Sequence, residues 1–249
     1  MTDSSTVLRI AESKMPDARR ALVVGATTSI GHIILQSLAM AGMHVLATGR
    51  ALPTADTAQL LIEHATLDLL NSDSLDRFAC EVVPAFGKLD VVLFLAGILP
   101  GKSLADYDDA LMQEVMTVNF TAHAALLRRL LPHFGRGAQV LLVSSISAER
   151  GSFDPIYAAS KAAQIAFVKS LATWLAPDIR VNAIAPGLIE NSSMYKAMAP
   201  ERRAHHLTQS PTRRLTTMQE IAGVIVDLCG PAWSNLNGQV IRINGGAHV

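Results

Sequence analysis

The chain has 249 residues, of which half are apolar and 17% are charged. This composition is typical of a folded protein and excludes extended disorder over most of the length. The 21 basic and 21 acidic residues cancel, which argues against nucleic acid or an anionic membrane as a partner held by bulk charge.

Neither the apolar runs nor the N-terminus indicates a membrane or export segment. No run reaches the ~20 apolar residues that a membrane-spanning helix needs, and the polar N-terminal stretch has no apolar signal core. We therefore expect a cytoplasmic protein with a flexible leader over residues 1–18 and a single domain over residues 19–249.

The first predicted elements, over residues 21–50, are an apolar strand, a glycine turn, an amphipathic helix and a second strand. The turn runs from Gly25 to Gly31, where a phosphate group would meet the N-terminus of the helix. A glycine turn between a strand and a helix also occurs for structural reasons alone, so the turn by itself leaves dinucleotide binding open.

The second strand ends in Ala-Thr-Gly followed by Arg50, with no acidic residue at that point. An acid there would accept hydrogen bonds from the ribose hydroxyls of NAD, whereas an arginine suits the 2′-phosphate of NADP. The sequence therefore favours NADP(H), with NAD(H) as the alternative. Arg50 as a solvated loop charge is the other interpretation.

The later elements alternate between strands and helices along the chain. Strands are predicted around 64–67, 89–97, 138–146, 179–187 and 238–246, and helices over 72–86, 106–134 (one or two), 155–175 and 217–229. The polar, Met-rich segment 188–211 is predicted to be a mobile helical excursion that closes on a ligand. Cys80 and Cys229 are predicted to be buried reduced thiols, and no residues have the spacing of a metal site.

Tyr157 and Lys161 lie four residues apart at the start of a predicted helix, so they share one helix face. A free phenol titrates near ~10, and a neighbouring cation is expected to lower that pKa so that the phenol can act as an acid or base. The pair alone is weak evidence, because two exposed helix residues can produce the same spacing.

Taken in order, the motifs resemble those of the short-chain dehydrogenase/reductase family from Ala21 to Gly246. They comprise the turn from Gly25 to Gly31, Ala96-Gly97, Asn119, Ser144-Ser145, Tyr157-x-x-x-Lys161, Asn182-Ala-Ile-Ala-Pro186-Gly187, and the run from Gly238 to Gly246. The resemblance implies an α/β fold with a doubly wound, Rossmann-type parallel sheet of about seven strands between two layers of helices.

The resemblance also implies the site residues and their roles. Tyr157 would be the general acid/base, Lys161 would lower its pKa and hold the nicotinamide ribose, Ser145 would bond the substrate oxygen, and Asn119 would hold a water of a proton relay. The cofactor would contact Gly25, Thr28, Ser29, Ile30, Gly31, Arg50, Asp68, Leu69, Ala96, Gly97, Tyr157, Lys161, Pro186, Gly187 and Ile189. Asp68 faces the adenine in this interpretation; alternatively it only begins a turn.

Three departures from the family pattern stand out. Ser29 replaces the middle glycine of the turn, and Phe94-Leu95 replaces a common Asn-Asn pair. Ser145 lies twelve residues before Tyr157, one fewer than usual in the family, so either the loop is one residue shorter or Ser144 takes the role. Ser145 is preferred, because it matches the pattern at the strand end and loops absorb deletions more easily than strands.

The leading hypothesis is an NADP(H)-dependent oxidoreductase that interconverts a secondary alcohol and a ketone. A non-catalytic dinucleotide-binding regulatory or scaffold protein of the same fold is the alternative, and a dehydratase or epimerase is disfavoured. Pocket walls are expected from Ile98-Leu99, 147–153 and 188–210, with Met194, Tyr195 and Met198 as contacts. Arg150 would meet a polar arm of the substrate or pair with Glu149 or solvent. The resemblance implies a homo-oligomer, a tetramer or a dimer, formed through the helices around 106–134 and 155–175.

Overall fold

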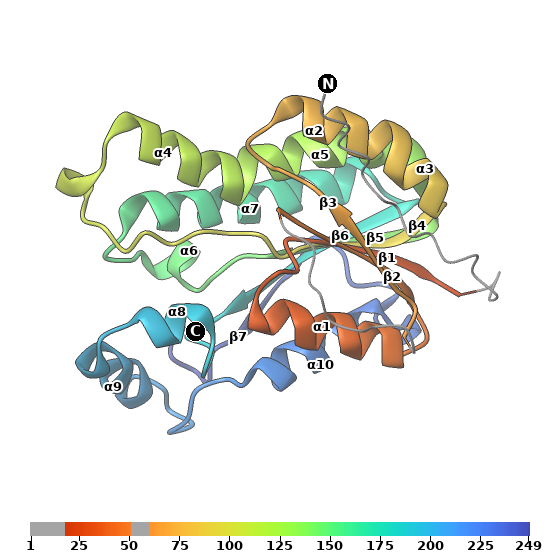
Figure 1. Ribbon diagram of the computed structural model, residues 1–249. Coiled ribbons are helices and arrows are strands. Elements are labelled where there is room, and N and C mark those ends of the chain that lie inside the picture. Colours follow the sequence, from red (N-terminus) through yellow and green to blue (C-terminus); the bar gives the residue numbers. More distant parts are fainter. Residues whose placement is uncertain (1–17, 51–59) are drawn as a thin grey trace.

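The computed structural model describes residues 18–50 and 60–249, and these contain one parallel sheet in the order β3-β2-β1-β4-β5-β6-β7 (Figure 1). The predicted leader lies outside the described residues except for its last residue. The strands are β1 (Arg20–Val24), β2 (His44–Gly49), β3 (Ile62–Thr66), β4 (Leu89–Phe94), β5 (Phe134–Val143), β6 (Ile179–Pro186) and β7 (Val240–Ile243). The predicted doubly wound fold is confirmed.

Helices cover both faces of the sheet (Figure 1). One face carries α1 (Ser29–Met40) and α10 (Met218–Cys229), which contact each other. The opposite face carries α2 (Ser72–Arg77), α3 (Val83–Phe86), α4 (Asp109–Met116), α5 (Ala122–Leu130) and α7 (Pro155–Trp174). Three short helices, α6 (Ser147–Arg150), α8 (Ser193–Ala197) and α9 (Pro200–Thr208), follow the carboxyl ends of β5 and β6.

The alternation of β1 shows why the sheet needs both layers. Leu22 and Val24 belong to the cluster under α2, α5 and α7, whereas Ala21 and Val23 belong to the cluster under α1 and α10. Successive strand side chains point to opposite faces, so a strand that is apolar throughout must be covered twice. All four side chains are fully buried.

Two helical runs contain a π-helical turn. Residues 72–86 form α2, a π-helical turn at Phe78–Val82 and α3, and residues 109–130 form α4, a π-helical turn at Thr117–Thr121 and α5. The first turn corrects one prediction: Cys229 is buried but Cys80 is exposed. Phe78, Ala79 and Val82 take the core-facing positions of this run, which leaves Cys80 on the solvent side.

The strand order reverses between β1 and β4, and the chain is closely packed at that point. Backbone N–H groups of Leu95 and Ala96 both donate to the Val24 carbonyl, at 2.9 Å each. In open parallel sheets, ligands bind outside the carboxyl ends of the strands at such a reversal. The architecture therefore directs attention to the segments that follow β1, β4, β5 and β6.

Candidate active site

The turn after β1 packs closely against the segment that follows β4. Gly25 has φ 89°, and a Cβ there would lie 2.5 Å from the Ala96 Cα, so only glycine fits. Thr28 caps α1 by accepting from the Gly31 N–H at 3.3 Å, and the first turn carries no acidic side chain. Such a helix N-terminus favours an anion, and these residues fit a dinucleotide phosphate.

Ser29 in place of glycine causes no backbone strain in this turn. It is the first residue of α1, after the extended N-cap Thr28, and among the described residues only Asn191 and Arg213 are non-glycine positions with positive φ. The Cβ of a serine is therefore tolerated here. The departure from the family pattern leaves the phosphate turn intact.

The other predicted cofactor residues lie at the carboxyl ends of neighbouring strands. Arg50 follows β2 and is exposed, and Asp68 and Leu69 follow β3 and are half-buried. Asp68 accepts from the Leu70 N–H at 3.0 Å, so one of its oxygens begins a turn as the alternative interpretation expected. The remaining members also sit at this edge: Ala96, Gly97, Pro186, Gly187 and Ile189.

Gly97 connects the cofactor edge to the predicted catalytic residues. A Cβ at Gly97 would lie 3.2 Å from the Lys161 Nζ and 3.3 Å from the Asn119 Oδ1. Only a residue without a side chain leaves that space free. The segment after β4 therefore runs directly beside Lys161.

Lys161 is buried, with 4% of its surface exposed, and its Nζ donates to the Val143 carbonyl at 2.8 Å. Burial lowers the pKa of Lys161 to about 8, because the charged form loses hydration. The Nζ lies 6.0 Å from the centre of the Tyr157 ring. The shared helix face predicted for the two residues is thus realised.

Tyr157 departs from the prediction in its proton affinity. Burial raises the pKa of Tyr157 most, a hydrogen bond with Ser145 lowers it, and the negative charge of Asp154 raises it. The prediction that Lys161 lowers this pKa is wrong for this structure, in which Lys161 is bonded to the Val143 carbonyl. In this state the phenol holds its proton at neutral pH.

The two adjacent serines have different partners. Ser144 donates its hydroxyl to the Lys161 carbonyl at 2.9 Å, which fixes β5 to α7. Ser145 accepts from the Ser147 N–H at 3.1 Å and bonds with Tyr157. Of the two, Ser145 is the one beside the phenol.

Asn119 is fully buried in the π-helical turn between α4 and α5. Its Oδ1 accepts from the Ile98 N–H at 2.8 Å, and its Nδ2 donates to the Ile98 carbonyl at 3.0 Å and to the Ser160 hydroxyl at 2.9 Å. The Asn119 backbone carbonyl accepts from the Gln164 side chain at 2.6 Å. A relay water on Asn119 would therefore have to use a remaining lone pair of that carbonyl or of Oδ1.

Several polar residues around Tyr157 were not singled out from the sequence. Ser160 and Gln164 continue the buried face of Tyr157 and Lys161 along α7, and His123 of α5 lies against Gln164 and Phe94. Burial lowers the pKa of His123 to about 3, and the Lys161 charge adds to this. The signal was the three- and four-residue spacing of polar side chains on an otherwise apolar helix face.

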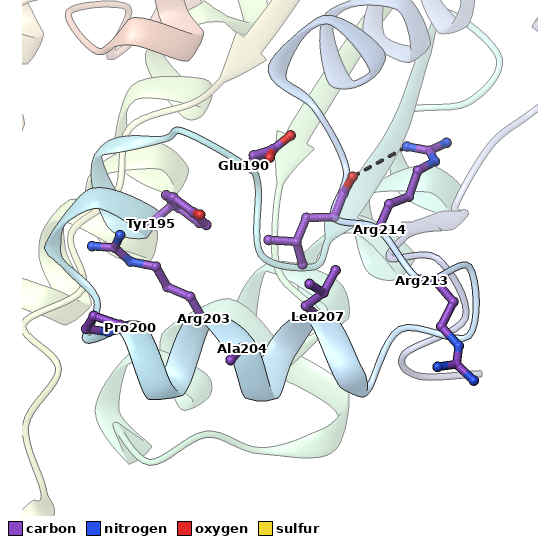
Figure 2. Close-up of a pocket in the computed structure, with 9 residues that line it drawn as sticks. Glu190, Tyr195, Pro200, Arg203, Ala204, Leu207, Arg213 and Arg214 are labelled. Atoms are coloured by element: carbon purple, nitrogen blue, oxygen red, sulfur yellow. Dashed lines mark hydrogen bonds between the residues drawn. The ribbon is translucent and has the colours of Figure 1, made fainter.

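A surface groove of about 420 Å³ lies between α8, α9 and residues 213–215 (Figure 2), and none of the predicted catalytic residues lines it. Arg203 crosses it, donating to the Met198 and Lys196 carbonyls at 2.7 and 2.8 Å and stacking on Tyr195 at 4.7 Å. The segment predicted as a helical excursion is thus helical, and its own side chains hold it together. Glu149 pairs with Arg242 at 2.6 Å, and among the described residues it forms no ion pair with Arg150, which was one of the alternatives for that arginine.

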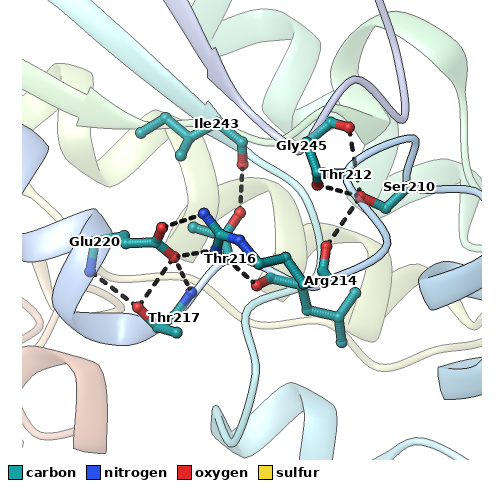
Figure 3. A network of polar contacts seen from close by, with 9 residues as sticks. Ser210, Thr212, Arg214, Thr216, Thr217, Glu220, Ile243 and Gly245 are labelled. Carbon is teal, nitrogen blue, oxygen red and sulfur yellow. Dashed lines mark hydrogen bonds and ion pairs between the residues drawn. The ribbon is translucent and has the colours of Figure 1, made fainter.

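The chain returns from α9 to α10 along β7 through a polar network (Figure 3). Thr216 donates to the Ile243 carbonyl at 3.2 Å, and Ser210 donates to the Arg214 carbonyl at 2.9 Å. Arg214 pairs with Glu220 at 2.6 Å, and Glu220 completes a capping box with Thr217 at the start of α10. The excursion is therefore anchored firmly at its C-terminal end.

The described residues, 18–50 and 60–249, contain neither a membrane-spanning helix nor a cluster of metal-binding side chains. None of the helices there is both long and apolar enough to cross a bilayer. In the same ranges, no three His, Cys, Asp or Glu side chains are grouped so as to hold a metal ion.

Fold and site together define a dinucleotide-binding α/β oxidoreductase with a buried tyrosine–lysine pair. The family model described as enoyl-(acyl carrier protein) reductase matches residues 25–248. The oxidoreductase YmfI of Bacillus subtilis is 31% identical over 92% of this chain and 99% of its own. The 3-oxoacyl-(acyl-carrier-protein) reductase FabG of Aquifex aeolicus is 31% identical over 90% and 95%.

Solved structures agree. A short-chain dehydrogenase/reductase from Brucella melitensis superposes with a TM-score of 0.84 at 29% identity, covering 93% of this chain and 97% of the other. An actinorhodin polyketide ketoreductase solved with NADPH superposes with a TM-score of 0.84 at 26% identity, with the same coverage. The chain belongs to the short-chain dehydrogenase/reductase family, whose members bind a nicotinamide dinucleotide.

Proposed function

We propose that the protein is an NADP(H)-preferring oxidoreductase that interconverts a secondary alcohol and a ketone, with Tyr157 as the general acid/base. One observation carries the proposal: Tyr157, Ser145 and Lys161 are buried together beside Gly97, at the edge that also holds the phosphate turn. A module that only bound the dinucleotide would need the turn but not this cluster. The site suits proton transfer next to the cofactor edge.

Each side chain has a role in the reduction direction. Tyr157 donates its phenolic proton to the carbonyl oxygen of the substrate, and the Ser145 hydroxyl donates a hydrogen bond to the same oxygen as negative charge develops. During the reaction the Lys161 ammonium would turn from the Val143 carbonyl to the phenolate left behind and stabilise it. A water on Asn119 would then relay a replacement proton to Tyr157. In the oxidation direction Tyr157 accepts the proton instead.

The dinucleotide would lie along the carboxyl ends of the strands. Gly25 and the start of α1, with Thr28, Ser29, Ile30 and Gly31, would hold the pyrophosphate. Asp68, Leu69 and Ala96 would border the adenosine, and Gly97, Pro186, Gly187 and Ile189 would border the nicotinamide. Arg50 would pair with the 2′-phosphate of NADP(H). When bound, the cofactor supplies or accepts the hydride.

Two named relatives guide the choice of substrate. One acts on a 3-oxoacyl group and another on 2-dehydro-3-deoxy-D-gluconate, by their names. Both are ketones, one with an apolar chain and one with polar arms. We therefore propose a small ketone or its alcohol as the substrate class, and a cytoplasmic, single-domain homo-oligomer, dimer or tetramer, as the working form.

The decisive experiment is a panel of ketones and secondary alcohols assayed by nicotinamide absorbance with the wild type and Tyr157→Phe. We expect turnover by the wild type, and a loss of roughly 10²–10⁴-fold in Tyr157→Phe with NADPH affinity nearly unchanged. Ser170→Ala, on the exposed side of the same helix α7, is the matched control and should retain turnover. Full activity of Tyr157→Phe would refute the mechanism, and a wild type that binds NADPH but turns over nothing would favour a non-catalytic binding protein.

A further inference from the structure

Asp154 is a buried carboxylate at the start of the catalytic helix, with 1% of its surface exposed. Its Oδ1 accepts from the Tyr157 N–H at 2.9 Å and so caps α7. The Tyr107 hydroxyl donates to both oxygens, at 2.8 and 2.9 Å. Oδ2 also accepts from the backbone N–H groups of Gly101 at 2.9 Å and Lys102 at 3.3 Å. An N-cap needs one acceptor, whereas Asp154 also accepts through Oδ2 from a second segment.

That second segment is residues 98–102, which follows Gly97 beside Lys161. Its first residue, Ile98, is held by Asn119 through both its N–H and its carbonyl. Asn119 in turn donates to Ser160, which donates to the Tyr157 carbonyl at 2.7 Å. One end of the segment is thus linked to the Tyr157 carbonyl and the other, through Asp154, to the Tyr157 N–H.

We propose that Asp154, together with Tyr107, is a positioning residue that holds the segment 98–102 and the Tyr157 backbone as one unit, so that the substrate and the phenol meet in a fixed geometry. The inference rests on the proposed function, because it assigns this segment to the substrate pocket. A small misplacement of a reacting group lowers the rate steeply. The hydrogen bonds of Asp154 prevent such a shift from the N-terminal side of α7.

The charge of Asp154 adds an electrostatic consequence. Burial and the negative charge of Asp154 raise the pKa of Tyr157, whereas Ser145 lowers it. Lys161 lies on the same helix face and donates to Val143. The Lys102 ammonium points to the Asp106 carbonyl, and the Tyr107 pKa is raised, so Tyr107 remains a neutral donor. Removing the Asp154 charge therefore lowers the Tyr157 pKa.

The first test compares Asp154→Asn with Asp108→Asn. Asp108 caps α4 in the same way, through the Leu111 N–H at 2.8 Å, but it is exposed and contacts neither Tyr157 nor the segment 98–102. We expect Asp154→Asn to lose roughly tenfold in kcat/KM and to shift the Tyr157-dependent limb of the pH–rate profile to lower pH. Asp108→Asn should match the wild type in both measurements. An unshifted limb in a folded Asp154→Asn would overturn the inference.

The second test uses Tyr107→Phe and does not depend on turnover. This variant keeps the Asp154 charge and loses one donor, so the pH limb should stay in place while KM rises. Hydrogen exchange of the cofactor-free protein should show faster exchange at Gly101 and Lys102 in both Tyr107→Phe and Asp154→Asn. Exchange equal to the wild type in both variants would overturn the inference, even if the wild type had no activity with any substrate. A wild type without turnover but with faster exchange in the variants would count against the proposed function alone.

Discussion

Two regions hold their polar side chains in opposite ways: a buried side, formed by α7 and the π-helical turn before α5, and an exposed rim, formed by Arg50, α8 and α9. On the buried side, α7 and the π-helical turn before α5 carry Asn119, Ser160 and Gln164, all fully buried and bonded to one another or to backbone. On the rim, Arg50 is exposed after β2, and none of the described residues of α8 and α9 is buried. The rim excursion is held by side chains such as Arg203 that bond to its own backbone.

The difference separates fixed chemistry from adaptable recognition. A buried polar network is costly to alter, because every change leaves an unpaired group in a low dielectric. An exposed helix can change its side chains with little effect on stability. The residues proposed to handle the proton occupy the first environment, and the residues that would choose the cofactor and substrate occupy the second.

The largest expected effect is on the buried side, at His123. The pKa of this residue is lowered by burial to about 3 in the folded chain, whereas an unfolded histidine titrates near ~6.5. Above pH ~6.5, His123 is neutral in both the folded and the unfolded chain. As the pH falls below ~6.5, His123 takes up a proton only in the unfolded chain. We therefore expect the free energy of unfolding to fall by up to roughly 1.4 kcal/mol per pH unit from this residue.

Urea unfolding at pH 7.5, 5.5 and 4.5 checks this. In His123→Gln the free energy of unfolding should fall less steeply with decreasing pH, by the slope that corresponds to about one proton. In His133→Gln, which changes a residue in the short helix before β5, it should fall as steeply as in the wild type. An equal slope in the wild type and His123→Gln would show that burial of His123 does not cause the loss of stability at low pH.

The next effect belongs to the rim, at Arg50. We expect Arg50→Asp to weaken NADPH binding about tenfold or more, because a charge-assisted pair with the 2′-phosphate becomes a repulsion. NADH affinity should change little. Fluorescence titration with both cofactors measures the ratio, and Arg128→Asp on exposed α5 surface is the control. Equal changes for the two cofactors would refute the assignment of NADP(H).

The smallest effect is expected at Arg203, inside the excursion. Arg203→Ala removes the bonds to the Met198 and Lys196 carbonyls and the stacking on Tyr195. We expect KM for the substrate to rise severalfold while the unfolding free energy changes by less than about 1 kcal/mol. Glu201→Gln on the same helix should behave like the wild type. A large loss of stability in Arg203→Ala would show that the rim, like the buried side, contributes strongly to the free energy of unfolding.

Most of the fold was predictable from local patterns. The glycine turn, the apolar strands and the capped helices depend on neighbours within a few residues, and the predicted helices 155–175 and 217–229 match α7 and α10 closely. Strand ends were less accurate: the predicted 138–146 is β5 over 134–143. The difference arises because pairing with β4 and β6, rather than local propensity, sets where a strand begins and ends.

The exposure of Cys80 and the proton affinity of Tyr157 were predicted incorrectly for a related reason. The exposure of Cys80 and the pKa of Tyr157 both depend on which side of a helix packs against the core. In the helical run that contains Cys80, a π-helical turn changes which residues lie on that side. For Tyr157 the sequence showed the neighbouring cation but not the depth of burial. Desolvation in the folded chain is the larger effect and raises the pKa.

The sequence by itself determined the family resemblance, the parallel sheet and the Tyr157–Lys161 pair, because those depend on residue type and spacing. Only the tertiary structure decided that Ser144 bonds to the Lys161 carbonyl, which leaves Ser145 beside the phenol. It also decided that Asp154 links the segment 98–102 and Tyr107 to the start of α7. Tyr107 and Asp154 are 47 residues apart in the chain. Contacts over such separations arise only when the sheet brings distant loops to one edge, and no local pattern encodes them.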